Sequence, residues 1–523
     1  MKYPYSLLII LLLTTGLYAA DRPNILFIMS DDHAVPAIGA YGKRFARLNP
    51  TPTLDRLAKN GLLFDQCFCT NSICSPSRAT ILTGQYPQTN GVLILDIPLK
   101  PECQYLPIEM KKLGYQTAMI GKWHLHEEPN FDYYQVLPGQ GKYFDPTFRT
   151  KGQGIWPKNL VKTKGHSSDV ITDLSLEWLK QRNDDKPFFL MHHYKAPHDW
   201  FEYAPRYENY LADTEIPEPT SLYNQPYFGS VATRGEKDSL RDKIGTSVSP
   251  RHNIRSYASQ LKGLDHSLPV AERTHQAYQK YLKMYLRCVK GVDDNLARLF
   301  AYLKASGQWD NTIILYTGDQ GMMFGEHDFQ DKRWMYEESM QMPLIIHYPA
   351  WIKQGRRTNL LVNNTDFAPT LLEMAGGSVP SYMQGCSFLS ELKGLTPIDW
   401  RTATYYRYWM HMIHHDVPAH FGLRTRDHKL IFFYGRHYDP ALYGTKSMVW
   451  LEKSNLVEPT PAAWEFYDLK NDPEETVNRY GDPKYTQIIA DMKIELKRQR
   501  EQLNETDAKY PEIQAVIDTH WDQ

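Results

Sequence analysis

The sequence predicts an α/β protein with a large, mostly parallel sheet sandwiched by helices, followed by a smaller C-terminal α+β domain. Short apolar runs that are typical of buried strands alternate with helical stretches along most of the chain, which is the pattern of a parallel sheet. After about residue 385 the runs become aromatic-rich, which indicates a separate antiparallel sheet. We therefore expect a catalytic domain over residues 21–385 and a second domain over residues 386–523.

The elements follow from hydrophobic spacing and from helix-ending glycines. Buried strands are expected at residues 25–29, 117–120, 188–191, 312–316 and 344–346. Helices are expected over residues 53–60, before Gly61, and 276–305, before Gly307. In the C-terminal domain, strands are expected at residues 403–410 and 429–434, and a closing helix at residues 488–503.

The first twenty residues have the pattern of a secretory signal peptide. Lys2 precedes an apolar run over residues 7–13, and Ala19 and Ala20 precede the polar chain that begins at Asp21. The run is too short for a membrane span, which needs about 20 apolar residues. We expect cleavage after Ala20, export to the periplasm or the extracellular space, and no membrane anchor.

Charge and composition narrow the function classes. The chain has 59 Lys and Arg against 60 Asp and Glu, a formal charge of −1, which argues against charge-driven nucleic-acid binding. Of six cysteines, Cys67, Cys69 and Cys74 crowd into one short stretch, which argues against a simple disulfide scheme. The pairing of the other cysteines stays open.

Charged and imidazole side chains follow four of the expected strands. In strand order, these are Asp31 and Asp32; Lys122 and His124; His192, His193 and His198; and Asp319 and Gln320. Because the carboxyl ends of parallel strands meet at one edge of a sheet, we expect these side chains to share a site. On a strand, His192 and His193 point to opposite faces, so at most one of them faces the site.

The carboxylates and the amide of this set favour a hard cation. Asp31, Asp32, Asp319 and Gln320 offer oxygen donors, which suit Ca²⁺ or Mg²⁺ better than zinc. The strand-end histidines do not have the H-x-x-x-H spacing of zinc hydrolases. We expect one Ca²⁺ ion, with Mg²⁺ as the alternative.

The segment Cys-Ser-Pro-Ser-Arg-Ala-Thr-Ile-Leu-Thr-Gly at residues 74–84 matches the signature C-x-P-S-R-x-x-x-L-T-G at every fixed position. Pro76 suits the first turn of a helix, and a helix N-terminus attracts anions. Arg78 lies one turn further on, where its guanidinium can make charge-assisted hydrogen bonds to residue 74.

On this signature the chain resembles the type I, formylglycine-dependent sulfatases of the alkaline-phosphatase-like superfamily. The resemblance continues through Gly-Lys-Trp-His at 121–124, Ala-Pro-His at 196–198, Gly-Asp-Gln-Gly at 318–321, Gly-Glu-His at 325–327 and Asp-Lys-Arg at 331–333. It implies that a formylglycine-generating maturation enzyme oxidises Cys74 to an aldehyde (3-oxoalanine), whose hydrate supplies the nucleophilic oxygen.

The resemblance also implies the roles of the site residues. The cation is held by Asp31, Asp32, Asp319 and Gln320 together with modified Cys74, although many sulfatases carry Asn or His at the position of Gln320. Asp319 is the expected base for the attack, and His198, assisted by Lys332, the acid for the leaving sugar oxygen. His124 is the base that regenerates the aldehyde. The full catalytic set is Cys74, Arg78, Lys122, His124, His198 and Lys332.

The implied function is hydrolysis of sulfate esters on carbohydrate, either glycosaminoglycan or algal oligosaccharides such as those of ulvan. A phosphate or phosphonate monoester hydrolase of the same superfamily and a catalytically silent sulfoglycan-binding protein are the alternatives. An aromatic, Arg- and His-rich segment over residues 405–426 is compatible with a sugar-binding surface and equally with a core strand. Arg407 and His415 are the residues that decide between these two interpretations.

Overall fold

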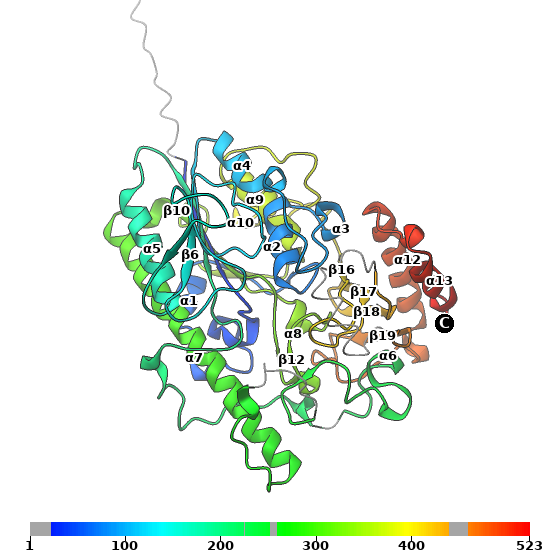
Figure 1. Cartoon of the computed structure of the whole chain (residues 1–523). Helices are drawn as coiled ribbons and strands as arrows, with labels where there is room; N and C mark the ends of the chain where they lie inside the picture. Colours follow the sequence, from blue (N-terminus) through cyan, green and yellow to red (C-terminus); the bar gives the residue numbers. More distant parts are fainter. Residues whose placement is uncertain (1–21, 224, 252–258, 439–458) are drawn as a thin grey trace, which may run out of the picture.

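The computed structural model describes residues 22–223, 225–251, 259–438 and 459–523, so the expected signal peptide lies outside the described residues (Figure 1). A ten-stranded sheet with the order β14-β2-β13-β10-β1-β8-β4-β5-β6-β7 forms the centre of the molecule. In chain order, its strands are β1 (Asn24–Ser30), β2 (Leu62–Phe64), β4 (Gln116–Lys122), β5 (Tyr133–Leu137), β6 (Thr147–Thr150), β7 (Leu160–Lys162), β8 (Phe188–Tyr194), β10 (Thr312–Gly318), β13 (Leu344–His347) and β14 (Arg356–Thr358).

The middle of the sheet is parallel, as the buried apolar runs predicted. β10, β1, β8, β4 and β5 all run in the same direction. The expected strand at residues 344–346 exists as β13, but it is antiparallel to β10, so its expected direction was wrong. The chain between them forms a small hairpin and a short helix instead of a long crossover helix, and without such a crossover the next strand returns in the opposite direction.

Helices cover both faces of the sheet and build two apolar layers (Figure 1). On β1, Ile25, Phe27 and Met29 face one layer, whereas Leu26 and Ile28 face the other. This alternation follows from the two-residue period of a strand. The helices of the first layer are α2 (Cys74–Thr83), α4 (Tyr105–Lys112) and α9 (Phe367–Met374), and those of the second are α1 (Pro52–Lys59), α5 (Ser167–Gln181) and α7 (Val270–Ala305).

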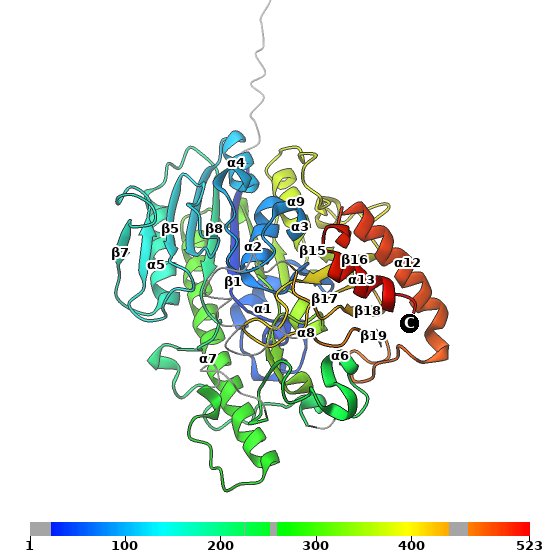
Figure 2. The same cartoon turned by 45° about the vertical axis from the view of Figure 1, so that its right-hand side comes forward.

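A four-stranded antiparallel sheet follows in the C-terminal part of the chain (Figure 2). Its strands, in order, are β16 (Ala403–Tyr408), β17 (His420–Thr425), β18 (His428–Phe433) and β19 (Ala463–Asp468). Helix α12 (Thr486–Gln502) packs across β16, β17 and β18. The apolar side chains of this sheet continue the layer that contains α2 and α9, so the small sheet is joined to the large one through a common core.

The remaining strands and α-helices are short, apart from the helix near the C-terminus. They are β3 (Cys67–Phe68), β9 (Thr246–Ser247), β11 (Met323–Phe324), β12 (Phe329–Asp331), β15 (Val362–Asn363), α3 (Pro87–Asn90), α6 (Val231–Arg234), α8 (Glu337–Met340), α10 (Leu389–Leu392) and α13 (Pro511–His520). All six cysteines are free thiols. Among the described residues, the search for a helix both long and apolar enough to cross a bilayer found none.

Candidate active site

Cys74 is the first residue of α2, and every residue of this helix is buried. Two serine hydroxyls fix the start of the helix: Ser75 Oγ donates to the backbone oxygen of His124 at 2.7 Å, and Ser77 Oγ donates to the backbone oxygen of Asp319. Burial raises the pKa of the Cys74 thiol, so the unmodified residue is a neutral thiol and a poor nucleophile. The geometry therefore presents residue 74, at a helix N-terminus, to the ends of the parallel strands.

The three aspartates predicted as ligands converge on Cys74. Ser30 pairs with Gly318 in the parallel ladder, so Asp31, Asp32 and Asp319 leave neighbouring strand ends side by side. One oxygen from each lies within 4.8 Å of the others, and all three side chains are fully buried. Cys74 Sγ is 3.5 Å from Asp31 Oδ1.

Gln320 completes the oxygen set. Its Nε2 donates to Asp32 Oδ1 and lies 3.9 Å from Cys74 Sγ, while its buried Oε1 has no hydrogen-bond partner among the described residues. A half-turn of the amide exchanges the two ends and directs the oxygen at the aspartates. Burial, followed by the charge of Asp31, raises the pKa of Asp319 to about 7. Crowded carboxylates next to an unsatisfied amide oxygen fit a hard divalent cation.

Three buried cationic side chains surround the carboxylates. Arg78 donates to Asp319 Oδ2 from Nε at 3.0 Å and from Nη2 at 2.9 Å, and its Nη1 donates to the backbone oxygen of Lys122 at 2.7 Å. Lys122 Nζ contacts Asp31 Oδ2, and Lys332 Nζ lies 2.5 Å from Asp32 Oδ2. Burial opposes ionisation of Asp31, but Lys122, His198 and Arg78 outweigh it and hold the pKa of this carboxyl well below its usual value.

The two histidines of the expected catalytic set reach the same place from different strands. His198 Nδ1 lies 2.6 Å from a carboxylate oxygen of Asp199, which leaves Nε2 directed inward, 3.8 Å from Asp32 Oδ2. His124 follows β4 and is 8% exposed, and its Nδ1 has no hydrogen-bond partner among the described residues. Burial, followed by the charge of Lys122, holds the pKa of His124 well below its usual value, so its imidazole is neutral.

Two protein families match this chain. Residues 23–378 match the Sulfatase family, and residues 325–460 and 455–502 match the family described as N-sulphoglucosamine sulphohydrolase, C-terminal. The chain belongs to the sulfatase family. It is a sulfuric ester hydrolase, and its alkaline-phosphatase-like fold agrees with the fold that the sequence predicted.

Three of the proteins that this sulfatase resembles have a carbohydrate in their names. It is 37% identical to an N-acetylglucosamine-6-O-sulfatase of Bacteroides thetaiotaomicron, over 93% of this chain and 88% of the relative. It is 26% identical to an ulvan-active sulfatase of Formosa agariphila, over 93% and 82%. The solved structure of BT4656 in complex with its substrate D-glucosamine-2-N,6-O-disulfate superposes with a TM-score of 0.80 at 35% identity, covering 94% of this chain and all of that one.

Sequence reasoning missed two charged residues that adjoin the site of the sulfatase. Lys195 is 4% exposed, and its ammonium lies 4.7 Å from the centre of the Tyr143 ring. Burial, followed by the charge of Lys122, lowers the pKa of Lys195 to about 8. Asp199 is the partner of His198 described above. Lys195 directly follows β8, so the strand-end pattern that revealed the other residues applies to it too.

The two neighbouring histidines of β8 face opposite ways, as the strand period predicted. His193 Nδ1 is 3.2 Å from the backbone oxygen of Lys122, next to Arg78, whereas His192 Nδ1 is 2.7 Å from Ser175 Oγ on α5. The close approach of β4 and β8 here requires glycine at residue 121, because a Cβ at Gly121 would lie 1.8 Å from the His193 backbone oxygen. His193 supports the site, and His192 belongs to the core on the other face.

The aromatic, Arg- and His-rich segment is mainly structural. Arg407 is 1% exposed, and its guanidinium pairs with Glu505 at 2.9 Å and Asp507 at 3.0 Å. The interpretation of Arg407 as a sugar ligand was therefore wrong, because its charge is already satisfied inside the C-terminal core. His415 differs: its Nδ1 lies 3.0 Å from Asp331, whose other carboxylate oxygen is 3.5 Å from Lys332 Nζ, so it borders the site.

Proposed function

We propose that this sulfatase hydrolyses sulfate esters of carbohydrate and that its principal substrate is the 6-O-sulfate of glucosamine residues. The observation that carries the chemistry is the position of Cys74, at a helix N-terminus 3.5 Å from Asp31 and beside a buried cluster of carboxylates and cations. The names of the two relatives above that are at least 35% identical support the choice of sugar.

The proposal includes one divalent cation, with Ca²⁺ preferred over Mg²⁺. Its ligands are Asp31, Asp32, Asp319, Gln320 and modified Cys74. It also includes conversion of Cys74 to formylglycine by a maturation enzyme. When present, the hydrated formylglycine supplies an oxygen nucleophile and the cation offsets the charge of the sulfate. The signature at residues 74–84 supports the conversion, and the crowded carboxylates with the unsatisfied Gln320 Oε1 support the cation.

We propose a separate catalytic role for each of the other side chains of the site. Lys122, Lys332 and Arg78 hold positive charge around the sulfate, where negative charge develops during the reaction. Asp319, whose Oδ2 is held by Arg78, takes the proton from the attacking hydroxyl. His198 gives a proton from Nε2 to the leaving sugar oxygen, while Asp199 holds its Nδ1. The neutral His124 takes the proton of the second hydroxyl of residue 74, and the C–O bond to sulfate then breaks, so that sulfate leaves and the aldehyde re-forms.

We also propose that the chain is exported to the periplasm or outside the cell after cleavage following Ala20. We propose residues 21–385 as the catalytic domain and residues 386–523 as the C-terminal domain. The signal-peptide pattern supports the first proposal, and the separate four-stranded sheet supports the second.

A regioselective sulfate-release assay tests this function. The enzyme, expressed with a maturation system, is incubated with N-acetylglucosamine 6-sulfate, N-sulfoglucosamine, a 2-O-sulfated uronate disaccharide and an aryl phosphate. We expect sulfate release from the 6-sulfate, no release by the Cys74→Ala variant, and loss with EDTA that added Ca²⁺ restores. Preferred cleavage of the aryl phosphate would contradict the proposal and favour a phosphate monoester hydrolase.

A further inference from the structure

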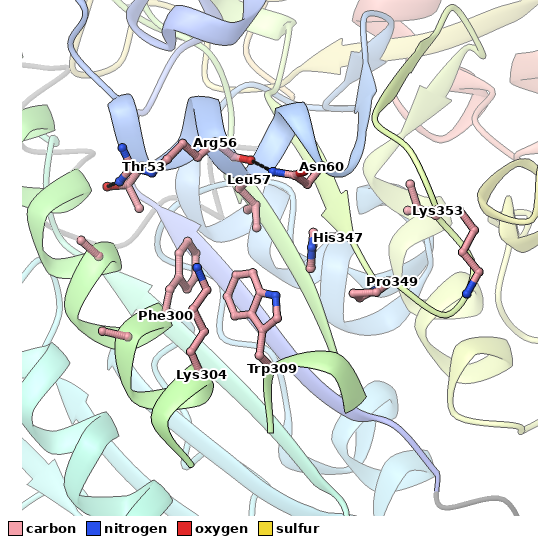
Figure 3. Close-up of a pocket in the computed structure, with 13 residues that line it drawn as sticks. Thr53, Arg56, Leu57, Asn60, Phe300, Lys304, Trp309, His347, Pro349 and Lys353 are labelled. Atoms are coloured by element: carbon pink, nitrogen blue, oxygen red, sulfur yellow. Dashed lines mark hydrogen bonds between the residues drawn. The ribbon is translucent and has the colours of Figure 1, made fainter. Parts of the chain in front are cut away.

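A pocket of about 460 Å³ lies between α1, the C-terminal end of α7 and the end of β13 (Figure 3). Polar and aromatic side chains from these elements and from the segments that follow or precede them line it, among them Arg56, Asn60, Lys304, Trp309, His347 and Lys353. None of these residues belongs to the candidate active site.

The pocket and the active site lie at opposite ends of β10. Trp309 precedes the first residue of this strand, Thr312, whereas Asp319 follows its last residue, Gly318. Seven residues at about 3.3 Å each separate the two ends by roughly 20 Å. A ligand in the pocket therefore does not occupy the catalytic centre.

The charge of the pocket favours an anion. Arg56, Lys304 and Lys353 are exposed at its walls, and no carboxylate is among the described residues that line it. Three cationic groups around one hollow attract sulfate or carboxylate groups, to which they can make charge-assisted hydrogen bonds.

An aromatic wall lies beside these cations. The half-buried ring of Trp309 has Lys304 Nζ 4.5 Å from its centre, and the rings of His347 and Phe300 lie 4.8 Å and 5.5 Å away. An indole combines a flat apolar surface with a polar edge, which suits the C–H face of a sugar ring. The pocket thus has an aromatic ring and cationic side chains in the same lining.

His347 adds a polar group that lacks a partner. It is 4% exposed, and its Nδ1 has no hydrogen-bond partner among the described residues. Burial, followed by the charge of Lys304, lowers the pKa of His347 to about 4, so the ring is neutral at physiological pH. A neutral imidazole therefore adds a polar, uncharged side to the wall of the pocket.

We propose that this pocket is a second, non-catalytic binding site for a sulfated saccharide unit. The exposed cations and the Trp309 ring together match a sugar ring that carries anionic groups. The choice of sulfate as the anion rests on the proposed function, since a carbohydrate sulfatase meets sulfated chains. Such a site would hold one part of a chain while the active site acts on another.

Calorimetric titration of the full-length Cys74→Ala variant tests this site without turnover. The probe is a heparin-derived tetrasaccharide, and its desulfated, N-acetylated counterpart is the second arm. We expect two binding sites for the sulfated probe and none in the pocket for the desulfated one. Adding Lys304→Gln or Trp309→Ala should weaken the second site about tenfold or more, since each loses a charge-assisted bond or a stacking surface.

The matched control is Lys59→Gln, which removes the same charge from α1 at an exposed position outside the pocket. It should leave both sites intact. A single site in the Cys74→Ala parent, equal affinities in the Lys304→Gln, Trp309→Ala and Lys59→Gln proteins, or equal binding of the desulfated probe would overturn the proposal. Because this titration needs no catalysis, failure of the proposed function appears separately, in the sulfate-release assay.

Discussion

Arg78 contacts a single oxygen of Asp319, Oδ2, through two nitrogens, Nε at 3.0 Å and Nη2 at 2.9 Å. Both side chains are buried. The contact ties the helix that begins with Cys74 to the end of β10, so it sets the distance between the nucleophile position and the carboxylate that we propose as its base.

The variant Arg78→Lys tests this contact. Lysine keeps the charge but cannot make the same forked contact, and we expect kcat to fall about 100-fold or more. The measurement is kcat on N-acetylglucosamine 6-sulfate, normalised to the fraction of residue 74 that mass spectrometry finds converted. Arg206→Lys, at an exposed pair with Asp169, is the matched control. A normalised kcat equal to that of the unsubstituted enzyme would contradict the role of Arg78.

The contact between His198 and Asp199 predicts a difference between two substrates. A sugar oxygen needs a proton when it leaves, whereas a nitrophenolate needs none. We therefore expect His198→Ala to lower kcat about 100-fold or more on the sugar sulfate and much less on nitrophenyl sulfate. Similar losses on both substrates would show that His198 is not the acid.

Asp199→Asn should act through His198, because the Asp199 carboxylate lies 2.6 Å from His198 Nδ1 and fixes the orientation of the ring. We expect kcat on the sugar sulfate to fall by about tenfold or more, and kcat on nitrophenyl sulfate, whose leaving group needs no proton, to fall much less. The KM should change little, because Asp199 is proposed to position His198 and not to bind the sugar. A loss of equal size on both substrates would contradict this positioning role.

Gln320 predicts a change in cation affinity. Replacing it by Leu removes one oxygen donor at similar volume, so the Ca²⁺ concentration for half-maximal activity should rise by about tenfold or more. Activity is measured against buffered free Ca²⁺. Gln104→Leu is the control, because this buried amide bonds to the backbone of Glu128 and Asn130 and to no residue of the site. If the activity of Gln320→Leu depends on the free Ca²⁺ concentration in the same way as that of the unsubstituted enzyme, Gln320 is not a ligand.

The buried carboxyl of Asp293, which is not part of the active site, should make the free energy of unfolding depend on pH. Its carboxylate accepts hydrogen bonds from the backbone N–H of Thr53 and Leu54 at the start of α1, and burial raises its pKa from 3.8 to about 6 despite them. The folded state thus binds this proton more tightly than the unfolded state. The resulting contribution to the free energy of unfolding is fully present below pH 4 and is lost as the pH rises from 4 to about 6. The loss is about 2 to 3 kcal/mol.

Unfolding free energies of the unsubstituted protein and Asp293→Asn, measured from pH 4 to 7, check this sign. The unsubstituted protein should lose stability relative to the variant as the pH rises. Parallel curves, or a relative gain with rising pH, would contradict the raised pKa.

Much of the fold could be predicted because the central strands are buried on both faces and appear as unbroken apolar runs. The same logic brought together Asp31, Lys122 and Asp319, since parallel strands end at one edge of the sheet. The direction of β13 could not be predicted, because it depends on how the preceding segment packs and not on the strand's own residues. The apolar residues of β13 would be buried equally well in a parallel or an antiparallel strand.

Side-chain partners were harder to predict than strand ends. Arg407 is separated from Glu505 and Asp507 by about a hundred residues, so its ion pairs exist through tertiary packing alone. Asp199 sits directly beside His198 in the sequence, yet its role depends on which ring nitrogen it contacts. Lys195 carries a strand-end signal but no motif that assigns it a role.

The most direct test of the central claim compares the conversion of Cys74 with sulfate release in the same samples. Preparations expressed with graded amounts of maturation enzyme are analysed by mass spectrometry of the peptide that contains residue 74, and by release of sulfate from N-acetylglucosamine 6-sulfate. Specific activity should rise in proportion to the formylglycine fraction, and it should extrapolate to zero where no Cys74 is converted. Full activity in protein whose Cys74 is entirely a thiol would contradict the account.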